Sequence, residues 1–338
     1  MPKFVGRFTR CVVTVSTCAA LSSTAGVGAA AADSYDDAYH PYAETVARLA
    51  TVVARNPGLM HLGSIGRSVQ GRDIPALTIG ELGGGAPRLL ITCGQHAREW
   101  ISVAVCMGLA NRYADGYSTD PAIKRLIDTH PIDIVPLVNP DGYEYTFTPD
   151  DPTDPDHRMW RKNRSGPNRS GPCRGVDLNR NFDYNWSEAG ASDDPCDENY
   201  AGPSAFSEPE TRALRGFIGP RNIGAAIDFH SFHQVVAYPE GRSSVPAPDR
   251  EQLAAVADLV ADAMSRSHGT RFRSGSAPEV LYPVGGGLPD WLYGTKGIPA
   301  LTVELRDTGR YGFELPPDQI RPSIDEALDG TNALLAEL

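Results

Sequence analysis

The first stretch whose side chains could carry out chemistry is TCGQHAREWIS, residues 92–102, in which His96 and Glu99 are three residues apart. An imidazole nitrogen and a carboxylate oxygen at this spacing can bind the same divalent metal ion. The chain has eight histidines, however, and glutamate is a common residue, so the spacing can also arise by chance. Only the surrounding elements and the rest of the chain separate the two interpretations.

The elements around this pair follow from an alternation of strand-like and helix-like patterns, which indicates an α/β fold. The patterns predict strands over residues 74–80, 88–93, 132–139, 225–230, 234–239 and 301–305, and helices over residues 41–56, 99–114, 207–218, 250–266 and 317–337. His96 and Glu99 follow one predicted strand, and His230 ends another. Because ligands collect beyond the carboxyl ends of strands in open α/β sheets, we expect these residues to converge.

Such a convergence would complete a metal site of known chemistry. Two histidines and one glutamate, with water in the fourth position, form one of the ligand sets of catalytic zinc. The third ligand has two candidates, His230 and His233 in DFHSFHQ, which an extended strand would direct to opposite sides. The residue pattern alone leaves this choice open.

Eight segments, which include those of His96 and His230, carry a resemblance to a known family. In chain order they are GRSVQGRDI (66–74), HAREW (96–100), NPDGYEY (139–145), MWRKNR (159–164), GVDLNRNF (175–182), FHSFHQ (229–234), LYPVGGGLPDW (281–291) and VELRDTGRYGFELP (303–316). Together they resemble the zinc metallocarboxypeptidases of the pancreatic carboxypeptidase A/B type, over roughly residues 37–338. The resemblance implies an α/β fold with a single domain, in which a mixed, mainly parallel, twisted β-sheet carries helices on both faces. It also implies cis peptide bonds at Ser231–Phe232, Pro239–Glu240 and Arg306–Asp307.

The resemblance implies one Zn²⁺ ion per chain and a role for each matching side chain. The zinc ligands are matched by His96, Glu99 and His230, and the carboxylate that orients the first ligand is matched by Asp177. The general base that activates zinc-bound water is matched by Glu304, and the group that polarises the scissile carbonyl with zinc is matched by Arg161. The clamp on the terminal carboxylate is matched by Asn179, Arg180 and Tyr282, and the peptide groove by Arg98, Phe232 and Phe313. His233 is interpreted as structural or groove-lining. Because arginine can bind a free carboxylate through two parallel hydrogen bonds, this set predicts release of single C-terminal residues from peptides and proteins.

The expected side-chain pocket departs from the family pattern. Pro289 occupies the position just before Asp290-Trp291 that sets specificity in the family, where an acidic residue goes with Lys or Arg. Four uncharged residues suggest apolar walls: Ala237, Ala277, Leu281 and Val284. We therefore expect a preference for aromatic and aliphatic C-terminal residues. Glu240 can also lie near the pocket and admit Lys or Arg, so broad specificity stays open.

The N-terminus predicts export. Residues 1–32 combine Lys3, Arg7 and Arg10 with an apolar stretch and an alanine run, which is typical of a secretory signal peptide. A lipid anchor at Cys18 is the alternative, but the preceding threonine fits a lipidation signal poorly. We therefore expect a secreted, extracellular protein without stable membrane association, whose catalytic domain spans residues 33–338. Pancreatic relatives carry a folded pro-domain, and we expect no large pro-domain here.

Four cysteines remain after the predicted cleavage: Cys93, Cys106, Cys173 and Cys196. An even number in an exported chain favours disulfides, for which sequence alone allows three pairings. The local pairs 93–106 and 173–196 close the shortest loops. A cysteine zinc site is the rival interpretation, but the chain has no CxxC motif.

Charge and motif content bear on the other classes of function. The formal net charge of −11 argues against nucleic acid as a partner, because no broad basic surface is available to neutralise phosphates. A cell-wall peptidase that cuts D-amino-acid linkages is disfavoured by the intact Asn179, Arg180 and Tyr282. A non-catalytic binding protein would require loss of a ligand or of Glu304, and none is missing. We expect a monomer.

Overall fold

A computed structural model of the 338-residue chain describes residues 34–148, 156–166, 173–242 and 248–338. The predicted signal peptide, residues 1–32, and the alternative anchor at Cys18 lie outside the described residues. Within these ranges, every helix is too short or too polar to span a bilayer.

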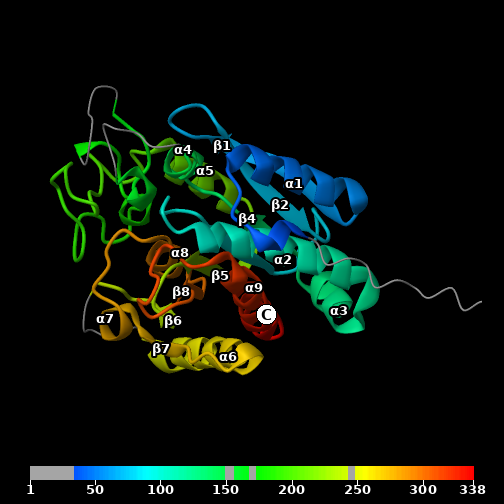
Figure 1. Ribbon diagram of the computed structural model, residues 1–338. Helices are drawn as coiled ribbons and strands as arrows, with labels where there is room; N and C mark the ends of the chain where they lie inside the picture. The colour runs from blue at the N-terminus through cyan, green and yellow to red at the C-terminus, as the bar shows by residue number, and fades with distance from the viewer. Residues whose placement is uncertain (1–33, 149–155, 167–172, 243–247) are drawn as a thin grey trace, which may run out of the picture. The chain divides into compact units, whose positions relative to one another are not determined.

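Eight strands of the described residues form one mixed sheet at the centre of the fold (Figure 1). They are β1 (Met60–Arg67), β2 (Asp73–Ile79), β3 (Arg88–Cys93), β4 (Ile132–Val135), β5 (Ile223–His230), β6 (Val235–Tyr238), β7 (Arg273–Ser276) and β8 (Ala300–Glu304). Their order is β1-β2-β4-β3-β5-β8-β6-β7, in which the central strands β4, β3, β5 and β8 run parallel. The predicted α/β fold with a mixed, mainly parallel sheet is therefore confirmed.

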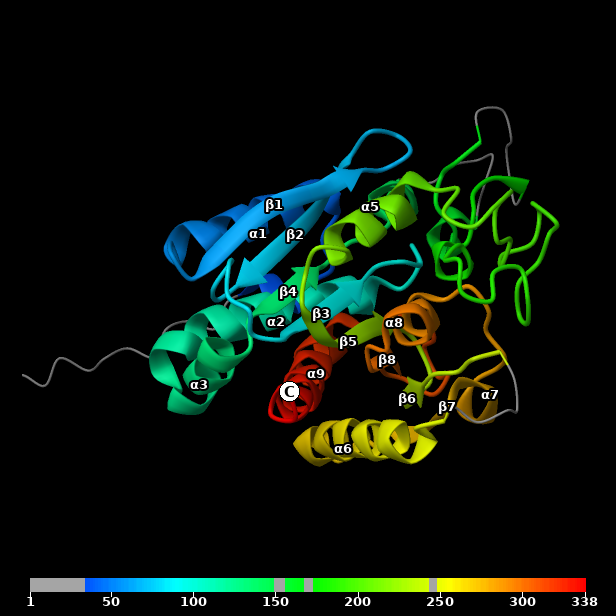
Figure 2. The same cartoon turned by 180° about the vertical axis from the view of Figure 1, so that it is seen from behind.

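Helices cover both faces of this sheet, as the two views in Figures 1 and 2 show. They are α1 (Tyr42–Arg55), α2 (Trp100–Thr119), α3 (Pro121–Thr129), α4 (Pro140–Thr146), α5 (Pro209–Ile218), α6 (Arg250–His268), α7 (Ala277–Val280), α8 (Leu288–Lys296) and α9 (Ile320–Leu335). The larger apolar core contains side chains of α1, α2, α6 and α9, and a second core contains side chains of α5 and α8. On β3, Leu89 and Ile91 belong to the larger core and Leu90 to the second, because successive strand residues point to opposite faces.

The same alternation directs polar residues at the carboxyl ends of the parallel strands to one face. On β5, Ala226 packs in the core with α5 and α8, so Asp228 and His230, two and four residues later, face that side too. On β8, Ala300 belongs to the same core, which places Glu304 on that face as well. The sheet thus collects chemically active side chains from neighbouring strands at one edge and on one face.

Among the described residues, disulfides join Cys93 to Cys106 and Cys173 to Cys196, which are the two local pairs. The first links the end of β3 to α2, so it holds the turn that carries His96 and Glu99 against the helix that follows. The cis peptide bonds expected at Ser231–Phe232, Pro239–Glu240 and Arg306–Asp307 are all present.

Candidate active site

The turn between β3 and α2 presents His96 and Glu99. Gly94 follows β3 with a positive φ of 65°, and a side chain there would press on Leu137 and Val103. The turn is also tied to a distant segment, because the backbone N–H of Ala97 donates to the carbonyl of Arg161 at 2.9 Å. Helix α2 begins at Trp100, immediately after Glu99. A sharp turn and one cross-link therefore fix both side chains.

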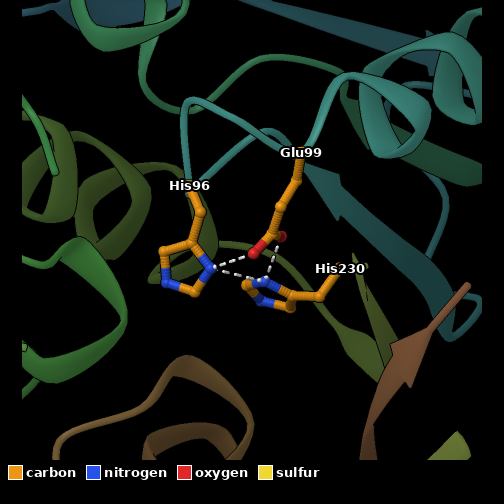
Figure 3. Close-up of side chains that lie close together, drawn as sticks. All are labelled: His96, Glu99 and His230. Carbon is orange, nitrogen blue, oxygen red and sulfur yellow. Dashed lines mark hydrogen bonds and ion pairs between the residues drawn. The ribbon is translucent and has the colours of Figure 1, made fainter. Parts of the chain in front are cut away.

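The three predicted zinc ligands lie together at this edge of the sheet, with their side chains pointing toward one another (Figure 3). Nδ1 of His96 is 2.8 Å from Oε1 of Glu99, and Nδ1 of His230 is 2.9 Å from Oε2 of the same carboxylate. The two Nδ1 atoms are 3.0 Å apart. All three residues are buried. One histidine from the turn after β3 and one from the end of β5 thus converge on one carboxylate.

This donor set fits zinc. Tetrahedral Zn²⁺, bound at about 2.0–2.1 Å to nitrogen and oxygen, brings its ligand atoms to about 3.3 Å from one another, close to the observed triangle. Burial opposes ionisation of the Glu99 carboxyl, but His96 and His230 outweigh burial and hold its pKa below the ordinary value. A charged carboxylate beside two imidazoles is the state that binds a divalent cation. The residues present therefore match the metal that the sequence predicts.

Both imidazoles are anchored on the side away from the shared carboxylate. Nε2 of His96 lies 3.2 Å from Oδ1 of Asp177, the partner that the sequence predicts. Nε2 of His230 lies 2.8 Å from Oδ2 of Asp228, a residue that the sequence analysis did not single out. The sequence could have indicated this contact, because Asp228 is a polar residue in an apolar strand and stands two positions before a candidate ligand. Residues two positions apart in a strand lie on the same face of the sheet.

Glu304 lies beside this centre, at the end of β8. It is the register partner of His230 on β5, and its side chain is buried. Burial, followed by the negative charge of Glu99, raises the pKa of the Glu304 carboxyl above its ordinary value. A carboxyl whose pKa is raised toward neutrality is suited to accept and return a proton near physiological pH.

Arg161 contacts the centre through Asp177 and His96. Its Nε and Nη2 atoms donate to Oδ2 of Asp177 at 3.0 and 2.8 Å, and its Nη1 atom lies 3.2 Å from Nδ1 of His96. Burial disfavours the charged guanidinium, but the carboxylate of Asp177 outweighs burial and raises the pKa of Arg161. The same carboxylate therefore positions a predicted ligand and the predicted electrophilic group.

The predicted carboxylate clamp adjoins the histidines. Arg180 is buried, donating from Nε to the carbonyl of Gly190 at 2.9 Å and from Nη1 to the carbonyl of Asn179 at 2.7 Å. Tyr282 is 42% exposed, and its ring centroid is 5.8 Å from the guanidinium carbon of Arg180. Gly286 packs against this segment with a φ of 71°, and a Cβ there would lie 2.4 Å from the carbonyl oxygen of Arg180. Only a glycine at position 286 therefore lets this part of the chain pass so close to Arg180.

One pocket brings these groups together. Its lining includes His96, His230, Glu304, Asn179, Arg180 and Tyr282, together with the predicted wall residues Ala237, Ala277, Leu281, Val284 and Pro289. An adjoining open hollow is lined by Arg98, Arg161 and Arg180 together with Glu198. The candidate metal centre therefore opens to a partly apolar pocket, and a polar hollow that shares Arg180 and Tyr282 with this pocket lies next to it.

The base of the pocket contains an acidic residue with unusual chemistry. Asp290 is buried, and both of its carboxylate oxygens accept from the backbone N–H of Gly241. Burial raises the pKa of Asp290 to about 7. Glu240, the possible acidic determinant, instead accepts a hydrogen bond from Tyr184 at 2.7 Å and lies 3.9 Å from Arg242. Glu240 does not line the pocket, whereas Asp290 does.

The three predicted groove residues form one cluster beyond the centre. The guanidinium carbon of Arg98 is 4.3 Å from the ring centroid of Phe313, and that ring is 5.0 Å from the ring of Phe232. Arg98 also donates to Glu198 at 2.8 Å, a partner that the sequence analysis did not identify. The three predicted groove residues thus pack against one another through Phe313.

The α/β fold brings a buried His-Glu-His group and a buried acid to the same edge of its sheet. This arrangement is typical of metal-dependent hydrolases, in which the metal ion acts as a Lewis acid. Comparison with known proteins identifies the family. Residues 45–330 match the zinc carboxypeptidase family. The chain therefore belongs to this family, and it is a metallocarboxypeptidase.

Individual relatives agree with this assignment. Carboxypeptidase B of Astacus astacus is 38% identical over 299 residues, covering 88% of this chain and 95% of the relative. Carboxypeptidase A2 of Mus musculus is 39% identical over 300 residues, covering 88% and 70%. Among solved structures, bovine thrombin-activatable fibrinolysis inhibitor in complex with tick carboxypeptidase inhibitor has a TM-score of 0.81 at 35% identity, covering 90% of this chain and 98% of that chain. The similarity thus extends to carboxypeptidases named both A and B.

Proposed function

We propose that this protein is an exported zinc carboxypeptidase that releases single residues from the C-termini of peptides, with His96, Glu99 and His230 as the zinc ligands. The observation that carries the proposal is the shared pocket, which is lined by two predicted ligands, by Glu304 and by the predicted carboxylate clamp. A reactive centre and a group for a terminal carboxylate are useful together only if cleavage occurs next to that terminus.

The chain's own residues account for the steps of peptide hydrolysis. Zinc, when bound, supplies a Lewis acid that polarises a carbonyl oxygen and lowers the pKa of water. Glu304 takes the proton from the attacking water and passes it to the departing amine, which its raised pKa favours. Arg161 donates hydrogen bonds to the carbonyl oxygen as negative charge develops there, and Asp177 holds the guanidinium in place.

The carboxylate clamp explains why a single residue would be released. Arg180 lies beside Asn179 and near Tyr282, so a free terminal carboxylate can be bound from several directions. An interior peptide segment offers no such charge to the guanidinium. On the other side of the centre, Arg98, Phe232 and Phe313 contact the preceding residues of the substrate.

Apolar and aromatic residues are the proposed C-terminal substrates. Ala237, Ala277, Leu281 and Val284 supply uncharged walls, and Pro289 replaces the acidic residue that goes with Lys and Arg in the family. One observation favours Lys and Arg as a second class: Asp290 is among the residues that line the same pocket. With a pKa of about 7, Asp290 is partly uncharged at neutral pH, which weakens its attraction for a cation.

Export is supported by residues 1–32 and by the disulfides Cys93–Cys106 and Cys173–Cys196, because disulfides persist mainly in oxidising compartments.

Kinetics on hippuryl-Phe, hippuryl-Arg and hippuryl-Phe amide test the proposal together. We expect zinc-loaded protein to cleave hippuryl-Phe fastest, hippuryl-Arg more slowly and the amide least. A strong preference for hippuryl-Arg would overturn the apolar specificity, and equal cleavage of the amide would overturn the exopeptidase assignment.

A further inference from the structure

We propose that Asp228 is a positioning residue of the metal centre, which fixes the orientation and tautomer of His230 as Asp177 does for His96. The inference rests on the proposed zinc site and deepens it. It gives the centre two histidine–carboxylate pairs, one behind each imidazole.

The geometry of β5 brings Asp228 behind His230. The two residues are two positions apart in the strand, so their side chains leave the sheet on the same face. Oδ2 of Asp228 lies 2.8 Å from Nε2 of His230, while Nδ1 of the same ring points to Glu99 and His96 (Figure 3). Asp228 is buried, with 2% of its surface exposed. The ring is therefore held between the carboxylate behind it and the ligand group in front.

This contact and a bound metal ion together select one tautomer of His230. Nδ1 of the same ring lies 2.9 Å from the carboxylate of Glu99, so the tautomer is fixed once a metal ion takes the lone pair on Nδ1. The ring hydrogen then lies on Nε2, where the carboxylate of Asp228, which only accepts hydrogen bonds, holds it. Asn179 competes for the same atom, because its Nδ2 atom lies 3.2 Å from Nε2. Its Oδ1 atom is committed to the backbone N–H of Leu288 at 2.9 Å, so the amide cannot turn its oxygen to the ring. The charged and shorter contact with Asp228 prevails, which leaves the N–H of Asn179 available for a substrate carboxylate.

Asp228 is itself held by the segment that carries the other two ligands. Thr92, its register partner on β3, donates to Oδ1 at 2.6 Å. Gln95, which immediately precedes His96, donates through Nε2 to Oδ2. One carboxylate thus links the strand that ends in His230 to the turn that carries His96 and Glu99.

The partners of two other buried aspartates, Asp177 and Asp133, show how the contact of Asp228 with His230 differs from an ordinary buried ion pair. Asp177 shares its carboxylate between His96, at 3.2 Å, and Arg161, at 2.8 Å. Asp133, on β4, bonds Thr78 as Asp228 bonds Thr92, but its cationic partner is Arg88 at 2.8 Å. Asp228 instead contacts a ring nitrogen of His230, a candidate metal ligand, at 2.8 Å. A carboxylate in this place orients a ligand and raises its basicity.

The test measures Zn²⁺ affinity of the full chain by competition with a chelator, for the wild type and for Asp228→Asn and Asp228→Ala. Asparagine keeps the shape of the side chain and one acceptor oxygen while it removes the charge, whereas alanine removes all three. Outer partners of metal ligands typically contribute about 10- to 100-fold to metal affinity, so we expect losses in this range, larger for alanine. Asp177→Asn is the matched variant behind the other histidine, and we expect a loss of similar size.

Asp133→Asn controls for the general effect of removing a buried aspartate. We expect it to shift the unfolding transition of the metal-free protein while zinc affinity of the folded protein stays unchanged. The absorption spectrum of Co²⁺-substituted protein reports the coordination of the metal and does not depend on the stability of the fold. We expect its bands to shift in Asp228→Asn but not in Asp133→Asn.

The outcomes separate this inference from the proposed function. Wild-type zinc affinity and an unchanged Co²⁺ spectrum in both Asp228 variants, with weakened binding in Asp177→Asn, would overturn the role of Asp228 alone. Equal zinc loss in Asp133→Asn and Asp228→Asn would also overturn it, because the effect would then be one of packing. A wild type that binds no Zn²⁺ would overturn the proposed function and this inference together.

Discussion

His230 and Glu304 are register partners at the carboxyl ends of the adjacent parallel strands β5 and β8. Because paired residues on neighbouring strands point to the same face, the predicted metal ligand and the predicted base are held side by side by main-chain hydrogen bonds. The turn after β3 adds His96 and Glu99 from the next strand in the sheet. The spacing of ligand and base is thus set by the sheet rather than by loops.

Replacing the base should abolish turnover without removing zinc. In Glu304→Gln the side chain keeps its size but cannot take a proton, so we expect kcat on hippuryl-Phe to fall about 10²- to 10⁴-fold. Glu304 is not among the three grouped ligands, so we expect zinc content to match that of the wild type. Steady-state kinetics and metal analysis on the same sample check both points. Wild-type turnover in this variant would contradict the assignment of the base.

Removing the buried arginine of the clamp should erase the preference for a free carboxylate. A hydrogen bond to a charged group contributes about 1.5–3 kcal/mol, so we expect Arg180→Ala to lose roughly 10- to 100-fold in kcat/KM on hippuryl-Phe. Cleavage of the corresponding amide should change little. Arg98→Ala is the matched control, because this arginine lies farther along the groove, against Phe313. Retained discrimination in Arg180→Ala would show that another group binds the terminal carboxylate.

Specificity should depend on pH through Asp290. Burial raises the pKa of this carboxyl to about 7, with Glu240 raising it further and Arg180 and Arg242 opposing. Below that pH the pocket carries a neutral acid, and above it a carboxylate that attracts cations. We therefore expect the ratio of kcat/KM for hippuryl-Arg over hippuryl-Phe to rise as pH increases through about 7.

Asp290→Asn provides the control for this pH effect. It keeps an oxygen for the backbone N–H of Gly241 but cannot ionise, so its ratio of kcat/KM values should be flat over the same pH range. A rise that persists in Asp290→Asn would assign the pH dependence to a different group.

The disulfide behind the metal turn should contribute to stability. Cys93 and Cys106 are 13 residues apart and both are buried. In the chain-entropy description, a cross-link of this length stabilises a fold by about 3 kcal/mol, so we expect Cys93→Ala/Cys106→Ala to lower the free energy of unfolding by about that amount. Denaturant unfolding monitored by circular dichroism measures it. An unchanged free energy of unfolding would mean that packing between β3 and α2 suffices.

The strands that carry the site could be predicted because their sequences are short apolar runs with clear ends. Residues 88–93, 225–230 and 301–305 correspond closely to β3, β5 and β8. Two edge strands could not be predicted. β1, MHLGSIGR, contains two glycines and is mostly half-exposed, and β7, RSGS, has almost no apolar character. Their pairing to β2 and β6, rather than their own residues, makes them strands.

The positions of the candidate site residues could be predicted from ordered motifs, but several of their partners could not. Asp228 stands in an apolar strand, and only the register with Thr92 and the approach of Gln95 reveal what it contacts. The ion pair between Arg98 and Glu198 joins residues 100 positions apart, which no local pattern indicates. Asp290 follows Pro289 in sequence, but its pKa depends on burial that only the packed fold creates.

Metal content and activity, measured on the same full-length sample, test the central claim most directly. The zinc content and the rate of release of phenylalanine from hippuryl-Phe are compared before chelation, after chelation and after Zn²⁺ is restored. The account predicts one zinc per chain, loss of hydrolysis with the metal and recovery on its return, with no recovery in His230→Ala. Hydrolysis that persists without zinc, or a full complement of zinc without hydrolysis, would contradict it.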